Sequence, residues 1–354
     1  MKKIFASLAA LGLAGALLIS GCGINAKANL IKVSQGEGIE LGYGNFVARL
    51  MQAQYDASYR SYYGDRYWTT DMSGKGKTLE QQVKETVADS LKQQYVARQH
   101  AADFNISISE EESKKIGEAA DKFLAANSEE AVRQLGAERD YVVRFFEDQY
   151  YYYHVEQALE GQADTTVSDE EANQKKFSYV KFAFQSTDSS TGKTSQVTEE
   201  QKAELMKQAK TLSTSADFDT TAKQMKQTVQ TANYGKSDVG DKSYKLPQAV
   251  LTALEGMEVG KVSDVVTVDN DGYYVLRLDS LSDADATAAK KKTLENKKKT
   301  EHAEEVFKQW ENEDGMTLNE AAWSKVKFNS LFQTKGQKLK NQSGTNSGSK
   351  GTSS

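Results

Sequence analysis

Cysteine and histidine, two residue types often used for nucleophilic, acid–base and metal chemistry, are scarce in this chain of 354 residues. There is one cysteine, Cys22, and there are three histidines, none of which lies between His154 and His302. One cysteine cannot form an internal disulfide, and scattered histidines do not form the clustered ligand sets of metal sites. No Ser/His/Asp or Cys/His arrangement and no phosphate-binding loop is present in the sequence. We therefore expect no metal and no other cofactor.

The charge balance excludes one class of partner. Charged residues make up 27% of the chain, both signs are mixed, and the net charge is -5. Proteins that bind nucleic acid carry a basic stripe or patch that neutralises phosphates, and an acidic chain of this kind has no such excess. We expect no nucleic-acid partner.

The single cysteine lies at the end of an N-terminal targeting signal. Lys2 and Lys3 precede an apolar stretch, 4–19, that is too short to span a membrane comfortably. The stretch ends in Ile19-Ser20-Gly21-Cys22, which resembles the lipobox of bacterial lipoproteins. The resemblance implies cleavage before Cys22 and acylation of that residue by diacylglycerol and palmitate, and two acyl chains hold a protein durably on a membrane. The alternative is an ordinary secretory signal. With the lipobox, the mature protein is extracytoplasmic on the outer face of the cytoplasmic membrane.

Short strands interrupt an otherwise helical pattern between residues 176 and 281. Residues 177–184 alternate as a strand, and the runs 262–268 and 273–278 flank Asp269-Asn270-Asp271-Gly272. Asn, Asp and Gly tolerate positive φ, so this last part indicates a hairpin. With helices at 198–212, 217–226 and 246–254 and a strand at 229–233, the segment is predicted to have the order β-α-α-β-α-β-β.

This order and its turns resemble the parvulin family of peptidyl-prolyl isomerases. Ser237-Asp238-Val239-Gly240 is similar to the Gly-Asp-Leu-Gly turn of the family, and 254–275 is similar to its closing segment. The resemblance implies catalysed rotation about X–Pro peptide bonds, for which the uncatalysed barrier is about 18–20 kcal/mol. It also implies a groove that holds proline, with Val239, Leu246 and Val250 at the groove positions.

The catalytic positions of the family are occupied differently here. The resemblance places the two family histidines at Lys181 and Tyr274 and the acid or cysteine near Gln230. Because no histidine lies between His154 and His302, no shift of register supplies the missing pair. We therefore favour a domain kept for peptide binding or as a structural spacer over an active isomerase, which stays the alternative. Lys181 and Tyr274 either form a substitute acid–base pair or, as we favour, are a solvent-directed lysine and a packed tyrosine.

The chain on either side of this segment is predicted to be helical. Thr78 to Gln81 and Ser109 to Glu112 have the form of capping boxes at two helix starts. Segments 83–91 and 101–112 are similar to the N-terminal domain of SurA- and PrsA-type folding factors, with Asn105 at a turn where the family usually has glycine. The resemblance implies that the helix after the parvulin-like segment returns to complete the helical domain.

Four consecutive tyrosines, Tyr150, Tyr151, Tyr152 and Tyr153, lie in a predicted helix over 137–159. Consecutive helical residues point 100° apart, so we expect one or two of these rings to face solvent. Exposed aromatic rings would suit the binding of unfolded polypeptides. The alternative is that the rings pack between helices.

The sequence thus predicts an α+β protein with a small parvulin-like domain inserted into a mostly helical, chaperone-like domain. The expected boundaries are a signal peptide 1–21, an anchor linker 22–44, a helical SurA/PrsA-like domain 45–168, the parvulin-like domain 169–283, a C-terminal helix 284–332 and a disordered tail 333–354. Within the C-terminal part we expect a strand over 323–328. The lysine clusters 290–292 and 297–299 indicate a solvated helix face, or a contact with anionic lipid or wall polymer.

The predicted function is that of a membrane-anchored extracytoplasmic folding factor that binds unfolded or newly exported proteins. One alternative is an active parvulin-type isomerase. Another is a structural or ligand-binding surface lipoprotein, which is disfavoured because the chain lacks the large α/β lobes of solute-binding lipoproteins. The sequence leaves open whether the chain forms a homodimer.

Overall fold

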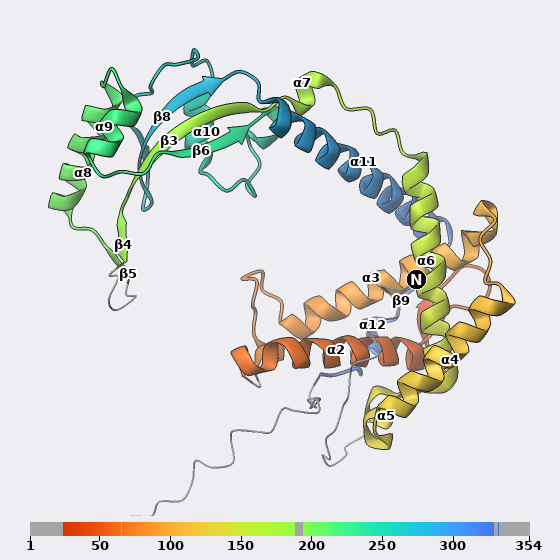
Figure 1. Ribbon diagram of the computed structural model, residues 1–354. Helices are drawn as coiled ribbons and strands as arrows, with labels where there is room; N and C mark the ends of the chain where they lie inside the picture. The colour runs from red at the N-terminus through yellow and green to blue at the C-terminus, as the bar shows by residue number, and fades with distance from the viewer. Residues whose placement is uncertain (1–23, 65, 188–193, 329–331, 333–354) are drawn as a thin grey trace, which may run out of the picture. The chain divides into compact units, whose positions relative to one another are not determined.

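The computed structural model describes residues 24–64, 66–187, 194–328 and 332 (Figure 1). Two compact units are present: the described parts of 1–162 and 302–354 form a helical unit, and 163–301 form a sheet-containing unit. The α+β class predicted from the sequence is confirmed. Among the described residues, no helix is both long enough and apolar enough to cross a membrane. Cys22 and the tail 333–354 lie outside the described residues.

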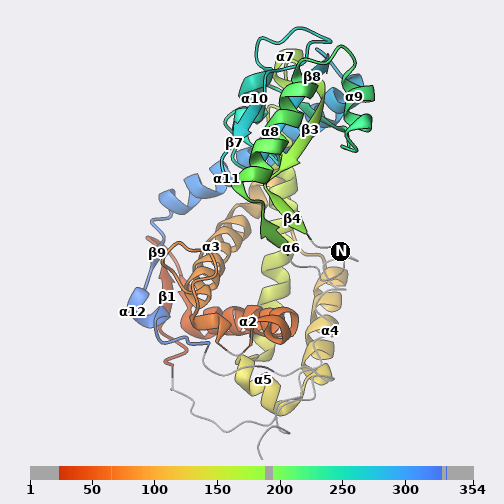
Figure 2. The same cartoon turned by 90° about the vertical axis from the view of Figure 1, so that its left-hand side faces the viewer.

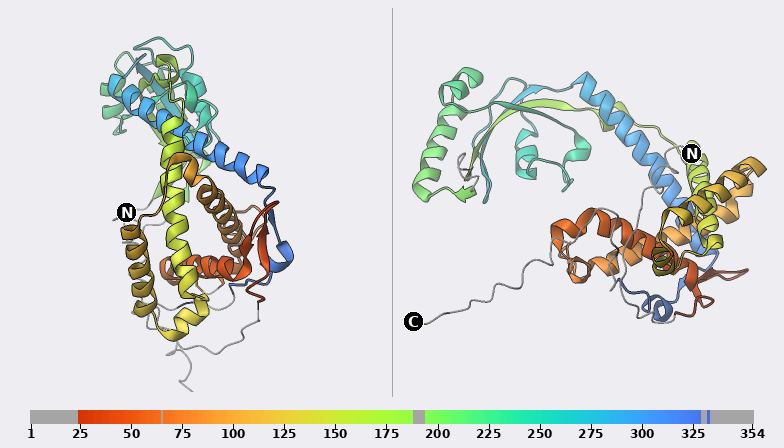
Figure 3. Two further views of the ribbon diagram at one scale, coloured as in Figure 1. Left: turned by 90° about the vertical axis from the view of Figure 1, so that its right-hand side faces the viewer. Right: turned by 60° about the horizontal axis from the view of Figure 1, so that its bottom comes forward.

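The helical unit is built mainly from five helices and the end of a sixth. They are α2 (Leu41–Tyr63), α3 (Leu79–His100), α4 (Glu110–Ala126), α5 (Glu129–Leu135), α6 (Arg139–Gln162) and the last part of α11 (Ala284–Glu313). Short helical turns η1 (Tyr67–Thr69), η2 (Ala101–Phe104) and α12 (Glu320–Trp323) complete it. Helix α6 packs against both α3 and α4 (Figure 3).

Local signals place the starts of these helices where the sequence predicts them. Thr78 accepts a hydrogen bond from the Gln81 backbone N–H while the Gln81 side chain accepts one from the Thr78 N–H, and Ser109 and Glu112 do the same. Both capping boxes are therefore confirmed. Asn105 has φ 56°, so it takes the left-handed conformation that the family's glycine would take.

A small sheet joins the two ends of the helical unit. The antiparallel order is β2 (Ile39–Glu40), β1 (Asn29–Lys32) and β9 (Thr317–Leu318). Leu30 and Ile31 are fully buried. The segment 22–44, expected to be a linker, is therefore folded from Asn29 on, because β1 buries two apolar side chains between strands from opposite ends of the chain.

The predicted strand over 323–328 is wrong. The chain forms α12 and then turns, with the Asn319 side chain accepting from the Ala322 N–H at 3.1 Å. Lys84 Nζ donates to the carbonyls of Trp323 and Val326 at 2.7 and 2.8 Å. These carbonyls bond to a side chain and not to a neighbouring strand, which is why the segment is not part of a sheet.

Residues from the C-terminal part also complete the helical core. Phe307 on α11 is 1% exposed and packs in the same cluster as Phe46 and Trp68. Burial of each such side chain stabilises the fold by about 1.5–3 kcal/mol. The chain therefore returns to the helical unit from His302 on, whereas residues 284–301 of the predicted C-terminal segment belong to the sheet-containing unit.

The second unit is organised around a four-stranded antiparallel sheet. The strand order is β6 (Gln230–Tyr234), β3 (Lys175–Ala183), β8 (Gly272–Ser280) and β7 (Val266–Val268). The helices are α7 (Asp169–Ala172), α8 (Glu199–Ser213), α9 (Phe218–Gln224), α10 (Gln248–Leu254) and the first part of α11, with η3 (Lys236–Asp238). The predicted order β-α-α-β-α-β-β and the closing hairpin are confirmed. An additional hairpin, β4 (Gln185–Thr187) with β5 (Thr194–Gln196), was not predicted.

The two faces of this sheet pack against different helices, because side chains alternate along each strand. On one face Phe177, Tyr179 and Tyr274 form a core with α10. On the other face Val180 and Phe182 form a core with α8 and α9, which lie beside β3 and β8 in Figures 1 and 2. Lys181 has the same parity as Tyr179, so its side chain belongs to the α10 face.

Candidate functional site

The register of the sheet brings the three predicted catalytic positions to one face. Lys181 on β3 lies opposite Tyr274 on β8, and Tyr179 on β3 lies opposite Gln230 on β6. All four side chains line one hollow of about 580 Å³. The other lining residues are Asp241, Lys242, Tyr244, Lys245, Leu246, Pro247, Gln248 and Asp271.

Asp271 binds both residues that the sequence analysis placed at the family histidine positions. Lys181 Nζ lies 2.5 Å from Asp271 Oδ1, and the Tyr274 hydroxyl donates to Asp271 Oδ2 at 2.6 Å. The expectation of a solvent-directed lysine is therefore wrong, because the turn between β7 and β8 places a carboxylate within reach of it. Tyr274, at 1% exposure, is packed as we favoured.

These contacts shift the pKa values of Asp271 and Tyr274. Burial alone would raise the pKa of Asp271, but hydrogen bonds from Lys181 and Tyr274 outweigh it and hold that pKa below its usual value. Burial, together with the bond to Asp271, raises the pKa of the Tyr274 hydroxyl well above its usual value. A general acid or base works best with a pKa near the working pH. Neither Asp271 nor Tyr274 has such a pKa at neutral pH.

Gln230, predicted to take the position of the family acid, supplies no ionisable group. The Tyr179 hydroxyl donates to Gln230 Oε1 at 2.8 Å. Burial raises the pKa of the Tyr179 hydroxyl, so this pair is neutral at physiological pH. The pair contributes hydrogen-bonding groups and an aromatic wall to the hollow, but no charge.

The three predicted groove residues are not equivalent in the structure. Leu246 lines the hollow, whereas Val239 packs, partly buried, against the core cluster below it. Val250 on α10 is fully buried in that cluster, so it supports the hollow without lining it. Tyr244 and Pro247, which the sequence analysis did not select, line the hollow next to Leu246.

Hydrogen bonds hold the loop that carries these apolar residues. Gln248 Oε1 accepts from the Gly240 N–H at 2.7 Å, and Gln248 Nε2 donates to the Asp241 carbonyl at 2.7 Å. The Tyr244 hydroxyl donates to the Asn233 carbonyl on β6 at 2.5 Å. The wall of the hollow is therefore fixed to the sheet before any ligand arrives.

Sequence reasoning missed Asp271 as a site residue because Asp269-Asn270-Asp271-Gly272 was explained completely as a turn. The turn is present: Asn270 has φ 59°, and the Asp271 N–H donates to the Val268 carbonyl at 3.1 Å. The signal that could have found Asp271 is its place three residues before Tyr274, the strand partner of Lys181.

The tyrosine run on α6 packs in part against the rest of the helical unit. Tyr150, Tyr151, Tyr152 and Tyr153 are all partly buried. Tyr152 stacks on Phe307 with ring centroids 5.3 Å apart, and the Tyr150 hydroxyl lies 3.1 Å from Glu112. Tyr151 and Tyr152 pack against the core of the helical unit, whereas Tyr150 and Tyr153 are not part of it, so the expectation that one or two rings face solvent stays a prediction.

The exposed aromatic rings of the helical unit lie at the end of α2. Tyr59, Tyr62 and Tyr63 are 45%, 81% and 57% exposed. Tyr59 also contacts Tyr55 and Tyr63, with ring centroids 5.5 and 6.2 Å away. Tyr55, Tyr59 and Tyr63 form a row on one helix, and together with the exposed Tyr62 they are called the tyrosine row on α2.

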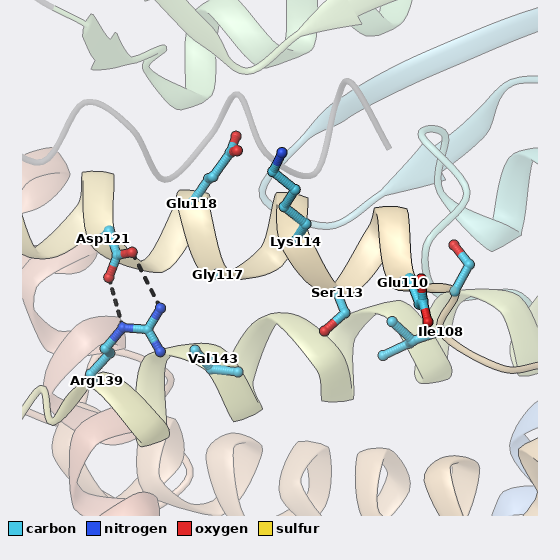
Figure 4. A pocket seen from close by; sticks show the side chains of 10 residues that line it. Ile108, Glu110, Ser113, Lys114, Gly117, Glu118, Asp121, Arg139 and Val143 are labelled. Atoms are coloured by element: carbon cyan, nitrogen blue, oxygen red, sulfur yellow. Dashed lines mark hydrogen bonds and ion pairs between the residues drawn. The ribbon is translucent and has the colours of Figure 1, made fainter.

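A second hollow, of about 780 Å³, lies between α4 and the start of α6 (Figure 4). Its charged side chains include Asp121 and Arg139, which form an ion pair with Nε 2.7 Å from Oδ1. The hydrogen bond from Arg139 lowers the pKa of Asp121. In Figure 4, Lys114 and Glu118 point away from α6. No group of acidic, histidine or cysteine side chains among the described residues could hold a metal ion.

The PPIC-type PPIASE domain family matches residues 171–291, the segment that contains the sheet and the first hollow. By this match the segment is similar to a PPIC-type PPIase domain, and it is called the PPIase domain below. The resemblance to parvulins is thereby confirmed. No curated protein matches the chain.

Solved structures similar to the chain include two PrsA proteins and a SurA-like chaperone. The foldase protein PrsA from Streptococcus pneumoniae is 16% identical, with 72% of this chain and 96% of that chain covered and a TM-score of 0.30. PrsA from Bacillus anthracis is 15% identical, with 66% and 99% covered and a TM-score of 0.29. A SurA-like chaperone structure from Campylobacter jejuni is 12% identical, with 66% and 88% covered and a TM-score of 0.24.

Proposed function

We propose that the chain is an extracytoplasmic folding factor, held on the membrane by lipid at Cys22, that binds unfolded or newly exported polypeptides. The observation that supports it best is the hollow on the α10 face of the PPIase domain. Tyr179, Tyr244, Leu246 and Tyr274 give this hollow aromatic and apolar walls, and lysine, aspartate and amide side chains line the rest of it. Ligand sites commonly combine such walls with a few orienting polar groups.

The polar groups of the hollow favour binding over rapid isomerisation. Catalysis of X–Pro rotation requires groups that stabilise the twisted amide more than the planar one. Lys181 and Tyr274 both direct their hydrogen bonds to Asp271, and Tyr179 directs its own to Gln230. The two tyrosine hydroxyls therefore already have acceptors within the site, and Lys181 directs one of its three N–H donors to Asp271 and not to a substrate carbonyl.

The second candidate function is peptidyl-prolyl isomerisation, which the family match to residues 171–291 favours. An isomerisation assay with a proline tetrapeptide, on the chain from residue 23 on, separates the two candidates. We expect saturable binding of the peptide and no acceleration of exchange. A variant with Lys181→His and Tyr274→His tests whether the family histidines restore activity. Clear acceleration by the parent chain would establish the isomerase and refute our preference.

Peptide binding itself is tested at the apolar wall. Leu246→Glu places a charge in the hollow and should weaken binding of the tetrapeptide at least tenfold, because an apolar wall would then have to accommodate a charge. Leu281→Glu is the matched control, since Leu281 is 56% exposed and does not line the hollow. Equal affinities of the two variants would place peptide binding elsewhere.

We further propose that clients contact the tyrosine row on α2. An exposed row of rings offers apolar surface without a fixed shape, which suits varied unfolded segments. Replacement of Tyr59, Tyr62 and Tyr63 by serine should reduce suppression of client aggregation, whereas serine at the partly buried Tyr153 should not. A chain that suppresses no aggregation in either form would instead be a surface lipoprotein without a folding role.

A further inference from the structure

More positively than negatively charged side chains line the hollow. Three lysines, Lys181, Lys242 and Lys245, line it against two aspartates, Asp241 and Asp271. The whole chain has a net charge of -5, so a positive excess at this site runs against the overall composition. The excess is informative only if the charges remain available to a ligand.

Both aspartates are already engaged by other residues. Asp271 binds Lys181 and Tyr274, as described above. Asp241 accepts hydrogen bonds from the Ser243 hydroxyl at 2.7 Å and the Ser243 N–H at 2.8 Å. These bonds lower the pKa of Asp241, so it is ionised at neutral pH and its lone pairs are partly occupied.

Lys242 and Lys245, in contrast, are exposed and have no ion-pair or hydrogen-bond partner among the residues that the structure describes. Two hydrogen bonds hold the loop that carries both lysines. The Tyr244 hydroxyl donates to β6, and Gln248 accepts from the Gly240 N–H. Their backbones are therefore held at the rim of the hollow while their ammonium groups can move on flexible stems. The charge that the site offers to a ligand is cationic.

We propose that the hollow selects client segments in which an aspartate or glutamate side chain adjoins the residue that the hollow holds, with Lys242 and Lys245 as specificity-determining residues. The proposal rests on peptide binding by this hollow. The carboxylate pairs with one or both ammonium groups at the rim while the apolar walls take the neighbouring side chain. The preference is modest because exposed ion pairs are weak: two of them give about a two- to tenfold difference in affinity.

The test is a titration of the chain from residue 23 on with three blocked tetrapeptides, Ala-Xaa-Pro-Phe, in which Xaa is Glu, Gln or Lys. We expect the Glu peptide to bind about two- to tenfold more tightly than the Gln peptide, and the Lys peptide to bind least tightly. The difference should shrink as salt is raised to about 0.5 M, because exposed charges are then screened within a few ångströms.

Charge reversal identifies the lysines. The double variant Lys242→Glu and Lys245→Glu should invert the order of the three peptides. The matched control is Lys210→Glu with Lys223→Glu, on α8 and α9, which makes the same change of net charge on helices that cover the opposite face of the sheet. The control should keep the parent order.

Equal affinities for the Glu and Gln peptides would overturn the inference and leave peptide binding intact. The inference would also be overturned if the preference for the Glu peptide survived the reversal of Lys242 and Lys245. The same holds if the Lys210→Glu and Lys223→Glu control abolished the preference as well. If none of the three peptides binds, peptide binding by this domain and the inference both fail.

Discussion

Removal of the Asp271 carboxylate tests how the cluster in the hollow holds together. In Asp271→Ala the Tyr274 hydroxyl, on a side chain only 1% exposed, loses its acceptor. A buried hydroxyl without a partner costs about 1–3 kcal/mol. The Lys181 and Asp271 side chains remain 30% and 36% exposed, so solvent screening limits their ion pair to at most about 1 kcal/mol. We expect a total loss of about 2–3 kcal/mol.

Two further variants divide this loss between its causes. Asp271→Asn keeps an acceptor for Tyr274 and loses the charge, so we expect about 1 kcal/mol of destabilisation from the weakened pairing with Lys181. Tyr274→Phe removes the hydroxyl that needs an acceptor. Introducing Asp271→Ala into Tyr274→Phe should therefore cost only about 1 kcal/mol, which predicts a coupling of about 1–2 kcal/mol between the two positions.

The assay must report on the PPIase domain alone. The chain has two compact units, so one unfolding curve for the whole chain does not define a single free energy. Hydrogen exchange of the β8 amides, Gly272–Ser280, measures opening of the sheet beside Asp271. Additive effects of Asp271→Ala and Tyr274→Phe on this exchange would refute the proposed cluster.

The same cluster predicts a pH dependence. The pKa of Asp271 is lowered in the folded chain, chiefly because the bonds from Lys181 and Tyr274 outweigh burial. Its contribution to stability is therefore present above the unfolded value of about 3.9 and is lost as pH falls through the folded value. The stability difference between the parent and Asp271→Asn should be constant from pH 7 to pH 5 and should shrink below pH 4. A difference that grows at low pH would contradict the lowered pKa.

Three further outcomes are expected from other parts of the chain. In the helical unit, Asp56 accepts hydrogen bonds from the Tyr67 hydroxyl at 2.5 Å, the Trp68 indole at 3.0 Å and the Phe332 N–H at 3.2 Å. Asp56→Ala should therefore destabilise this unit by about 3 kcal/mol or more, measured by urea unfolding followed by tryptophan fluorescence. Thr78→Ala removes the capping box of α3 and should cost about 1 kcal/mol in the same assay, with Thr78→Ser restoring most of it. Cys22→Ala should release the protein from the membrane fraction of producing cells, and unchanged membrane association on immunoblots would contradict lipid anchoring at this residue.

The sequence by itself determined the features that depend on residues close together along the chain. The capping boxes at Thr78 and Ser109, the left-handed turn at Asn105 and the closing hairpin around Asn270 all formed as predicted. Each involves a side chain and a backbone group within a few residues, so composition and spacing are enough. The absence of histidines between His154 and His302 also follows from the sequence alone, and it set the expectation of a site without the family pair.

Only the tertiary structure decided what each of these side chains contacts. The antiparallel register sets Lys181 opposite Tyr274 and places Asp271 within reach of both, which turned an expected turn residue into the centre of the site. Packing against α3, α4 and Phe307 buried much of the tyrosine run on α6, while Tyr62 at the end of α2 was left exposed. Burial and cross-strand pairing depend on residues that are distant in the chain. Helices α2 and α6 are both rich in aromatic residues, and local spacing does not say which of their rings will be covered.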